Sequence, residues 1–228
     1  MQSTSIDDRT NTIATQLIHR LREEIVSRVL QPGAKINLAA VRESLGVSLS
    51  PLRETLARMT AEGVVEFKDN RGNRVAPVSI ANLAEVTQLR IELESLALRH
   101  AMANGDFRRE GDVVSALHRL GRIARGPARP ETLAAWEAAH RDFHLTLIAG
   151  FGMPLLLSTC RVLLNLNGRY RRVFLQERGG DRDVALEHGE IAERAMARDV
   201  EAACASLRQH IQRIGTNLHR YLSQKAAS

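Results

Sequence analysis

The sequence is poor in cysteine, in aromatic residues and in long apolar runs. Its 228 residues include 2 cysteines, and aromatic residues make up 4% of the chain. This excludes the disulfide framework of a small secreted protein, so we expect Cys160 and Cys204 to be buried thiols in a reducing cytoplasm. No apolar run approaches the ~18 residues of a membrane span, and residues 1–12 do not have the pattern of a signal peptide. We expect a cytoplasmic protein with no membrane partner.

The chain also lacks a strongly basic half. The net charge is +6, but residues 1–78 carry 11 Lys and Arg against 9 Asp and Glu, and residues 79–228 carry 21 against 17. Overall charge is therefore weak support for nucleic-acid binding. Such a function has to be argued from the places of individual basic residues.

Residues 46–63 have the pattern of the second half of a helix-turn-helix. Gly46 ends a short helix that Leu38, Val41 and Leu45 mark. Ser50 can then accept from the free amides of a new helix, and Pro51 fits the first helical position, where its missing N–H costs nothing. Gly63 ends this helix. Its predicted buried face is formed by Leu52, Leu56 and Met59.

Arg53 and Ala57 fall on the opposite face of this helix. A small residue beside an arginine near a helix N-terminus allows close approach to DNA, where the arginine can bind a guanine edge or a phosphate. We assign Arg53 to DNA, with Ser48 and Ser50 positioning the backbone. Arg42 of the preceding helix is a further candidate, and a solvated helix charge is the alternative for it.

Residues 64–78 predict a β-hairpin: residues 64–67 alternate like a strand, residues 69–73 form a turn, and residues 75–78 return. An amphipathic helix over residues 13–30 precedes the helix-turn-helix. Three helices followed by a basic, glycine-containing hairpin make a winged helix, whose wing suits the DNA backbone or minor groove. The alternative for the hairpin is a plain turn with solvated charges. The candidate wing residues are Lys68, Arg71, Gly72 and Arg74.

Residues 79–228 predict helices and no convincing strand. The Gly and Pro breaks divide them into spans of about 80–104, 108–125, 131–150, 153–177, 182–198 and 199–223. Six helices joined by short loops favour an antiparallel bundle. The expected fold is mainly α, with an N-terminal winged helix-turn-helix over residues 1–78 and a C-terminal antiparallel six-helix bundle over residues 79–228.

Four of the eight histidines lie on the apolar stripes of three predicted bundle helices: His140 and His144, His188, and His210. A single histidine on an apolar face is usually a hydrogen-bonded core residue. Four converging imidazoles each need a partner, and one metal ion provides it for all of them. The pattern therefore indicates a metal site, with polar core residues as the alternative. Imidazole ligands favour Zn²⁺ or Ni²⁺ over Mg²⁺ or Ca²⁺.

The segments PGAKIN, LGVS, SPLRETLARMTAEGVVEF and RGNRVAPVS together resemble the DNA-binding domain of the GntR family of bacterial transcription regulators. The helical half resembles the all-helical (FCD-type) effector domain of the FadR-like branch of that family. Two positions depart from the family pattern. Many members have arginine where this chain has Leu49 and Ala39, so the family's usual operator cannot be assumed.

The resemblance implies a metal motif, D-x-x-F-H followed by E-H and a final His. This chain has His140-x-x-Phe143-His144, Glu187-His188 and His210. His140 therefore stands where the family usually has an aspartate, and whether it ligates is open. Asp142 falls on the wrong side of the helix and is expected at the surface.

The resemblance also implies a small carboxylate effector bound beside the metal. Arg90 matches a family position that faces this pocket, and an ion pair with Glu94 one turn later is the alternative. Asn165, Asn167 and Arg169 are further candidates for polar pocket groups, and the sequence does not decide which of them faces inward.

Together these patterns predict a DNA-binding regulator, with repression favoured by the resemblance, that binds an inverted-repeat operator as a homodimer under the control of a small organic acid. A regulator for which the metal itself is the signal is the second hypothesis. A metalloenzyme is the third. It lacks an obvious general base beside the histidines and the known nucleophile and phosphate-loop motifs, and it leaves the winged helix unexplained.

Overall fold

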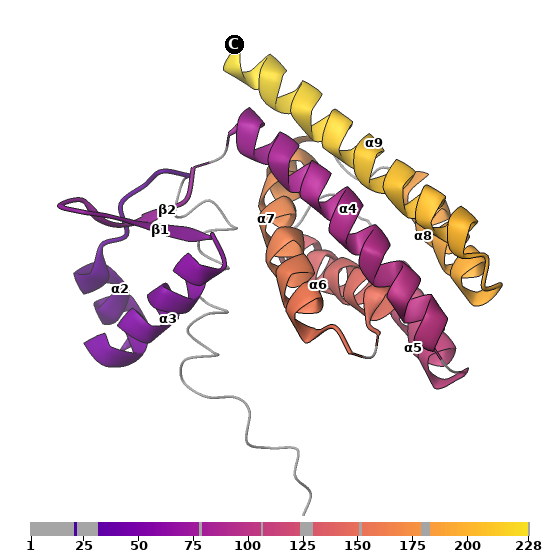
Figure 1. Cartoon of the computed structure of the whole chain (residues 1–228). Helices are drawn as coiled ribbons and strands as arrows, with labels where there is room; N and C mark the ends of the chain where they lie inside the picture. Colours follow the sequence, from indigo (N-terminus) through magenta and orange to yellow (C-terminus); the bar gives the residue numbers. More distant parts are fainter. Residues whose placement is uncertain are drawn as a thin grey trace, which may run out of the picture. The chain divides into compact units, whose positions relative to one another are not determined.

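The computed structural model describes residue 21 and residues 32–77, 79–105, 107–123, 130–150, 152–178 and 183–227. These residues form eight helices and one two-stranded sheet (Figure 1). The chain divides into two compact units, residues 1–78 and residues 79–228. The predicted mainly α fold is confirmed.

The N-terminal unit contains two short helices and a hairpin. Its elements are α2 (Leu38–Leu45), α3 (Leu49–Ala61), β1 (Val65–Lys68) and β2 (Gly72–Val75), and the two strands pair antiparallel. Gly46 makes the turn between the helices with a φ of +63°, which glycine adopts without steric cost. Apolar side chains from all four elements share one core. The helix expected over residues 13–30 lies outside the described residues except for Leu21, which is buried in this core.

Helix α3 begins earlier than the sequence predicts. Ser48, and not Ser50, occupies the N-cap position, and its side chain makes no capping hydrogen bond. Pro51 is the third helical residue. Its missing N–H costs nothing there either, because the first amides of a helix have no acceptor within the helix. The proline therefore marks the first turn without fixing the first residue. The buried face is the predicted one, with Leu52, Leu56 and Met59.

One basic residue of the hairpin lies away from its tip. Residues 69–71 form the turn, where Arg71 is exposed. Arg74 is the third residue of β2, opposite Glu66, and its guanidinium donates a hydrogen bond to the carbonyl oxygen of Gly33 at 2.7 Å. Arg74 therefore lies within a strand and not in the turn of the wing, because β2 begins already at Gly72.

The second unit contains the six predicted helices, within a few residues of their predicted bounds: α4 (Ile80–Asn104), α5 (Phe107–Arg122), α6 (Pro130–Ile148), α7 (Pro154–Arg178), α8 (Asp183–Met196) and α9 (Val200–Ala226). Helix α4 packs along α9 in the opposite direction (Figure 1) and also contacts α7, while α5 packs on α6 and α8. One apolar core, which includes Leu98, Phe143, Ile191 and Leu207, runs between them. None of the helices in the described part of the chain has the length and apolar character of a membrane span.

Hydrogen bonds attach the first turn of α4 to the middle of α7. The side chain of Ser79 caps α4 by accepting from the N–H of Asn82 at 3.0 Å. The buried hydroxyl of Tyr170 on α7 donates to the side-chain oxygen of Asn82 at 2.6 Å, and it accepts from the N–H of Ser79 at 3.5 Å. The start of the helical unit is therefore held by a residue 91 positions later in the chain.

Both cysteines are buried free thiols, as predicted. Burial raises the pKa of the Cys160 thiol to about 12, and it also raises the pKa of Cys204. Because the thiolate is the reactive form, both side chains act as small apolar core residues.

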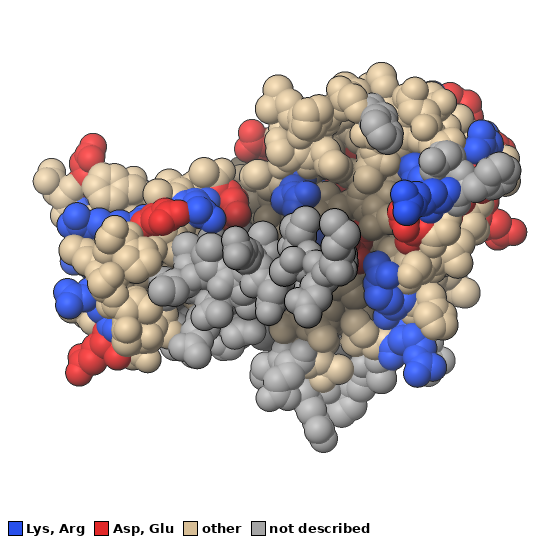
Figure 2. Space-filling view, turned by 90° about the horizontal axis from the view of Figure 1, so that it is seen from below, with Lys and Arg blue, Asp and Glu red and all other residues tan. Residues whose placement is uncertain are grey.

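Acidic and basic side chains are interspersed on the surface that Figure 2 shows. Over the N-terminal unit, at the left of that view, Lys and Arg lie among Asp and Glu. This agrees with the even charge balance of residues 1–78. Particular basic residues, and not a broad field of one sign, therefore decide where this unit can hold an anion.

Candidate metal centre and nucleic-acid interface

Four histidines meet in the core of the helical unit. His140 and His144 come from α6, His188 from α8 and His210 from α9, and at most 2% of each residue is exposed. One nitrogen of each ring can be chosen so that these atoms lie within 4.8 Å of one another. The structure thus brings together the four predicted ligands, and we call them the histidine cluster.

The histidine cluster fits a transition metal. Zinc binds imidazole at about 2.0–2.1 Å, which places tetrahedral donors about 3.3 Å apart. Atoms within 4.8 Å of one another reach that geometry by small side-chain movements. The Nδ1 atom of His140 is buried without a hydrogen-bond partner among the described residues. A buried polar atom without a partner is costly, and a bound cation would remove that cost.

Two carboxylates orient histidines of the cluster from outside. The Nδ1–H of His210 donates to Oε2 of Glu187 at 2.7 Å, and Nδ1 of His144 lies 3.3 Å from Oε2 of Glu94. Arg213 binds both oxygens of Glu187, one of them at 2.8 Å. A carboxylate at Nδ1 selects the tautomer whose Nε2 lone pair is available to a metal.

Burial favours the neutral form of three histidines of the cluster. It lowers the pKa of His144 to about 4, against the opposing effect of Glu94. It also lowers the pKa of His210, and burial with the charge of Arg171 holds the pKa of His140 well below its usual value. Neutral imidazole is the form that ligates metals, so the environment favours metal binding near neutral pH.

The same surroundings keep the orienting carboxylates ionised. Burial alone would raise the pKa of Glu94, but the charge of Arg90 and the nearby His144 ring lower it to about 2. For Glu187, the hydrogen bonds from His210 and Arg213 outweigh burial and lower the pKa to about 2 as well. Both side chains therefore act as hydrogen-bond acceptors at neutral pH.

Arg90 is buried and bound to Glu94, which was the alternative the sequence left open. Its Nε donates to Oε1 of Glu94 at 2.6 Å and its Nη2 to Oε2 at 3.3 Å. Its Nη1 donates to Oδ1 of Asn167 at 3.0 Å. Arg90 and Asn167, both predicted as effector-binding residues, thus lie together beside His144, and an effector carboxylate at Arg90 would compete with Glu94.

A second buried arginine, missed in the sequence, completes this network. Arg171 binds Glu137 through two hydrogen bonds of 2.7 and 2.6 Å, and it donates to the same Asn167 oxygen at 3.1 Å. Its guanidinium lies 5.6 Å from the centre of the Trp136 ring. Two guanidinium groups therefore converge on one neutral oxygen. Arg171 follows Asn167 by one helical turn on α7. The helical spacing that places Asn167 on one face of this helix therefore places Arg171 on the same face.

Two further side chains lie apart from this network. Arg169 is half-buried, and its charge acts on Tyr170, the residue bound to the start of α4. Asp142 is at the surface, as predicted, and forms an ion pair with Arg119 at 2.7 Å.

The predicted DNA-binding side chains lie on the exposed face of the N-terminal unit. Ser48 and Ser50 are exposed at the start of α3, and Arg53 is exposed at the beginning of its second turn. Arg42 is exposed on α2, and Gly72 begins β2 with a φ of +70°. Lys68 is half exposed and forms an ion pair with Glu66 at 2.9 Å.

Comparison with known families identifies both units. The model for bacterial regulatory proteins of the gntR family matches residues 13–75, and the model for the FCD domain matches residues 85–213. The chain belongs to the GntR family of transcription regulators. As a member with an FCD domain it is a DNA-binding regulator and not an enzyme, which removes the metalloenzyme hypothesis.

Related transcriptional regulators match over most of the chain. The uncharacterised transcriptional regulator BphR of Paraburkholderia xenovorans is 34% identical over 85% of this chain and 80% of its own length. The transcriptional repressor GlaR of Escherichia coli is 28% identical over 84% of this chain and 89% of its own. The structure of Escherichia coli McbR/YncC has the same fold, with a TM-score of 0.77 over 93% of this chain and 100% of that one, at 21% identity.

Proposed function

We propose that this GntR protein is a repressor controlled by a small organic acid. In this proposal, it acts in the cytoplasm as a homodimer that binds an inverted-repeat DNA operator through two winged helices. Its helical unit holds a divalent metal, Zn²⁺ first and Ni²⁺ second, at the histidine cluster. The observation that carries the proposal is the convergence of four buried histidines from three helices, in a unit joined to a DNA-binding domain.

The histidine cluster would hold the ion through ring nitrogens that face one another. For His144 and His210 these are the Nε2 atoms, because Nδ1 of each is next to a carboxylate. A bound transition metal supplies positive charge and, where a coordination position stays open, a docking point for an acid. Glu94 and Glu187 keep the two rings in place for this task.

Charge balance supports an anionic effector. Each of the three glutamates next to the site already has an arginine partner: Glu94, Glu137 and Glu187. With neutral imidazoles, these three ion pairs leave none of the three glutamates free to balance a bound cation. A divalent cation would add two positive charges to a buried site, where uncompensated charge is unfavourable. An organic acid would offset that charge.

Arg90 and Arg171 are the groups of this chain that would bind the acid. Both donate to the single oxygen of Asn167, at 3.0 and 3.1 Å. A carboxylate is a better acceptor for two guanidinium groups than a neutral amide oxygen. An acid that takes this place would move Asn167. The effect of the acid on DNA binding is limited by the difference between its affinities for the DNA-binding state and the non-binding state of the regulator.

The metal site is tested by removing ligands. We expect the wild-type protein, purified without chelator, to contain about one zinc ion per chain by elemental analysis. The double variant His188→Ala, His210→Ala should contain almost none, because two donors are lost. Glu187→Ala should keep the four donors but weaken metal affinity about 10- to 100-fold in a chelator competition.

His118→Ala is the matched control for the metal analysis, because His118 is exposed on α5. It should retain the full metal content. If the double variant also retained its metal, the ligand assignment would be wrong.

The DNA contact is tested at Arg53. On a duplex that the wild-type protein selects from a random-sequence library, Arg53→Ala should weaken binding by about 1–3 kcal/mol at fixed salt. The matched control is Arg58→Ala on the same helix, where Arg58 is exposed and forms an ion pair with Glu54 at 2.5 Å. It should bind as the wild type does. Equal affinity of Arg53→Ala and wild type in a fluorescence anisotropy titration would remove Arg53 from the interface.

One observation favours the second hypothesis, a metal-sensing regulator. Four imidazoles can complete a tetrahedral site, which leaves no position for an effector. In that case, metal titration alone would change operator affinity, and no organic acid would do so. An acid that changes operator affinity only in the metal-loaded protein would support the effector hypothesis instead.

A further inference from the structure

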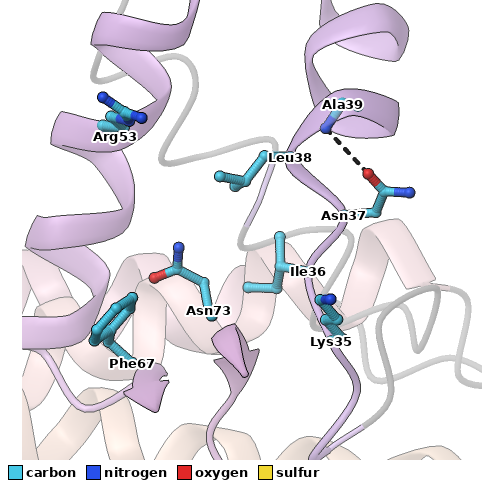
Figure 3. A pocket seen from close by; sticks show the side chains of 9 residues that line it. Lys35, Ile36, Asn37, Leu38, Ala39, Arg53, Phe67 and Asn73 are labelled. Atoms are coloured by element: carbon cyan, nitrogen blue, oxygen red, sulfur yellow. Dashed lines mark hydrogen bonds between the residues drawn. The ribbon is translucent and has the colours of Figure 1, made fainter. Parts of the chain in front are cut away.

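The N-terminal unit has a groove of about 650 Å³ between the segment before α2, the side of α3 that carries Arg53, and the hairpin. We call it the wing groove. Figure 3 shows Arg53 on one side, Leu38 on the other, and Phe67 with Asn73 from the hairpin below them. Lys35 lies at the edge formed by the segment before α2. Of the nine residues that line the groove, Arg53 and Gly72 were predicted from the sequence as DNA contacts.

The wing groove combines an apolar floor with a cationic rim. Its two charged residues are Lys35 and Arg53, and none of its nine lining residues carries a carboxylate. Phe67 is 62% exposed. Contact of an aromatic ring with water is unfavourable, so a partner that covers this ring would gain free energy. Phe67 and Asn73 are partners in the strand register, so the ring and the amide lie side by side on one face of the hairpin.

This chemistry matches the backbone of a nucleic acid strand. A sugar–phosphate chain alternates an apolar sugar ring with an anionic phosphate, whereas an acidic peptide has no apolar ring at each repeat. Arg53 of α3 also lines the groove. The DNA whose bases contact α3 would therefore also pass through the groove with its backbone.

We propose that the wing groove binds one strand of the DNA backbone, with Phe67 against a deoxyribose and with Lys35 and Asn73 at the flanking phosphates. This inference rests on the proposed DNA-binding function and adds to it a sequence-independent contact. Apolar and phosphate contacts would fix the register of the protein on the duplex, while Arg53 of α3 reads the bases.

The two kinds of contact differ in their dependence on salt. A phosphate contact releases counterions, so its loss makes affinity less dependent on salt. A contact with a sugar does not. Loss of Phe67 should therefore weaken binding without a change in the salt slope. Loss of Lys35 should reduce the slope.

The test uses the full-length protein and two duplexes, one that the wild type selects from a random library and one of random sequence. Phe67→Ala should weaken binding to both by the same factor, about tenfold, with the slope of log K against log salt unchanged. Phe67→Leu should retain most of the affinity. Lys35→Ala should reduce the slope by about one on both duplexes. Arg58→Ala, on α3 outside the groove, should leave the slope as in the wild type.

The outcomes distinguish a failure of the groove assignment from a failure of the DNA-binding proposal. If Phe67→Ala bound both duplexes with wild-type affinity, the groove assignment alone would be overturned. It would also be overturned if the affinity fell for the selected duplex only, since that result indicates a base contact. A wild-type protein that binds neither duplex would overturn the DNA-binding proposal together with this one. Equal thermal midpoints of Phe67→Ala and wild type would show that the variant is folded.

Discussion

Glu137→Gln should lower the free energy of unfolding by about 3–5 kcal/mol, one of the largest effects that a single conservative change can have in this protein. Glu137 and Arg171 are 2% and 6% exposed and joined by two hydrogen bonds. Glutamine keeps the shape of the side chain, but it leaves the buried guanidinium without a counter-charge. Urea unfolding at pH 7, followed by circular dichroism, measures the loss.

The matched control is Asp142→Asn. Asp142 binds Arg119 at 2.7 Å, but the two side chains are 53% and 55% exposed. Water screens such a pair, so the expected loss is below about 1 kcal/mol. The double variant Arg171→Met, Glu137→Leu should recover most of the stability lost by Glu137→Gln, because it removes both buried charges. Equal losses for Glu137→Gln and Asp142→Asn would contradict the importance of burial.

Mild acid should destabilise the metal-free protein steeply. Burial lowers the pKa values of His140, His144 and His210 in the folded protein, that of His144 to about 4. Below the ordinary histidine pKa of 6.5 the unfolded chain therefore binds more protons than the folded one, so stability falls as the pH falls. Each such histidine contributes about 1.4 kcal/mol per pH unit, and three together contribute about 4 kcal/mol per unit at most.

Below pH 4.5 Glu94 acts in the same direction. Its folded pKa of about 2 lies below the unfolded value of 4.5, so its stabilising effect is lost between these two values. Unfolding free energies measured by urea from pH 7.5 to 4.5 isolate the histidine effect. His144→Gln should flatten the dependence, and His118→Gln, exposed on α5, should leave it unchanged. A flat profile in the wild type would show that the buried imidazoles are not held neutral.

Much of the helical unit could be predicted because its signals are local. Glycine and proline breaks between apolar stripes mark the helix ends, and the six observed helices match the predicted spans closely. The histidine cluster was predictable for the same reason. His140 and His144 lie one helical turn apart on one apolar stripe. His188 and His210 each lie on the apolar stripe of their own helix.

The polar network was less predictable because it depends on contacts across the fold. Arg171 and Glu137 are 34 positions apart, and no local pattern shows that they meet. Arg90 has a carboxylate one turn away in the sequence, but the sequence alone could not decide between that partner and an effector. Local signals also misplaced the start of α3, since Pro51 is tolerated at any position in a first turn.

The bond of Tyr170 to the first turn of α4 connects the buried network with the junction of the two units. Asn167, Tyr170 and Arg171 occupy a single turn of α7. Asn167 accepts from the guanidinium groups of Arg90 and Arg171, which are proposed to bind the acid. Tyr170 donates to Asn82, in the first turn after the start of the second unit at residue 79. A displacement of this turn by a bound molecule would therefore be passed on to the residues where the chain leaves the DNA-binding unit, without any change in the metal ligands.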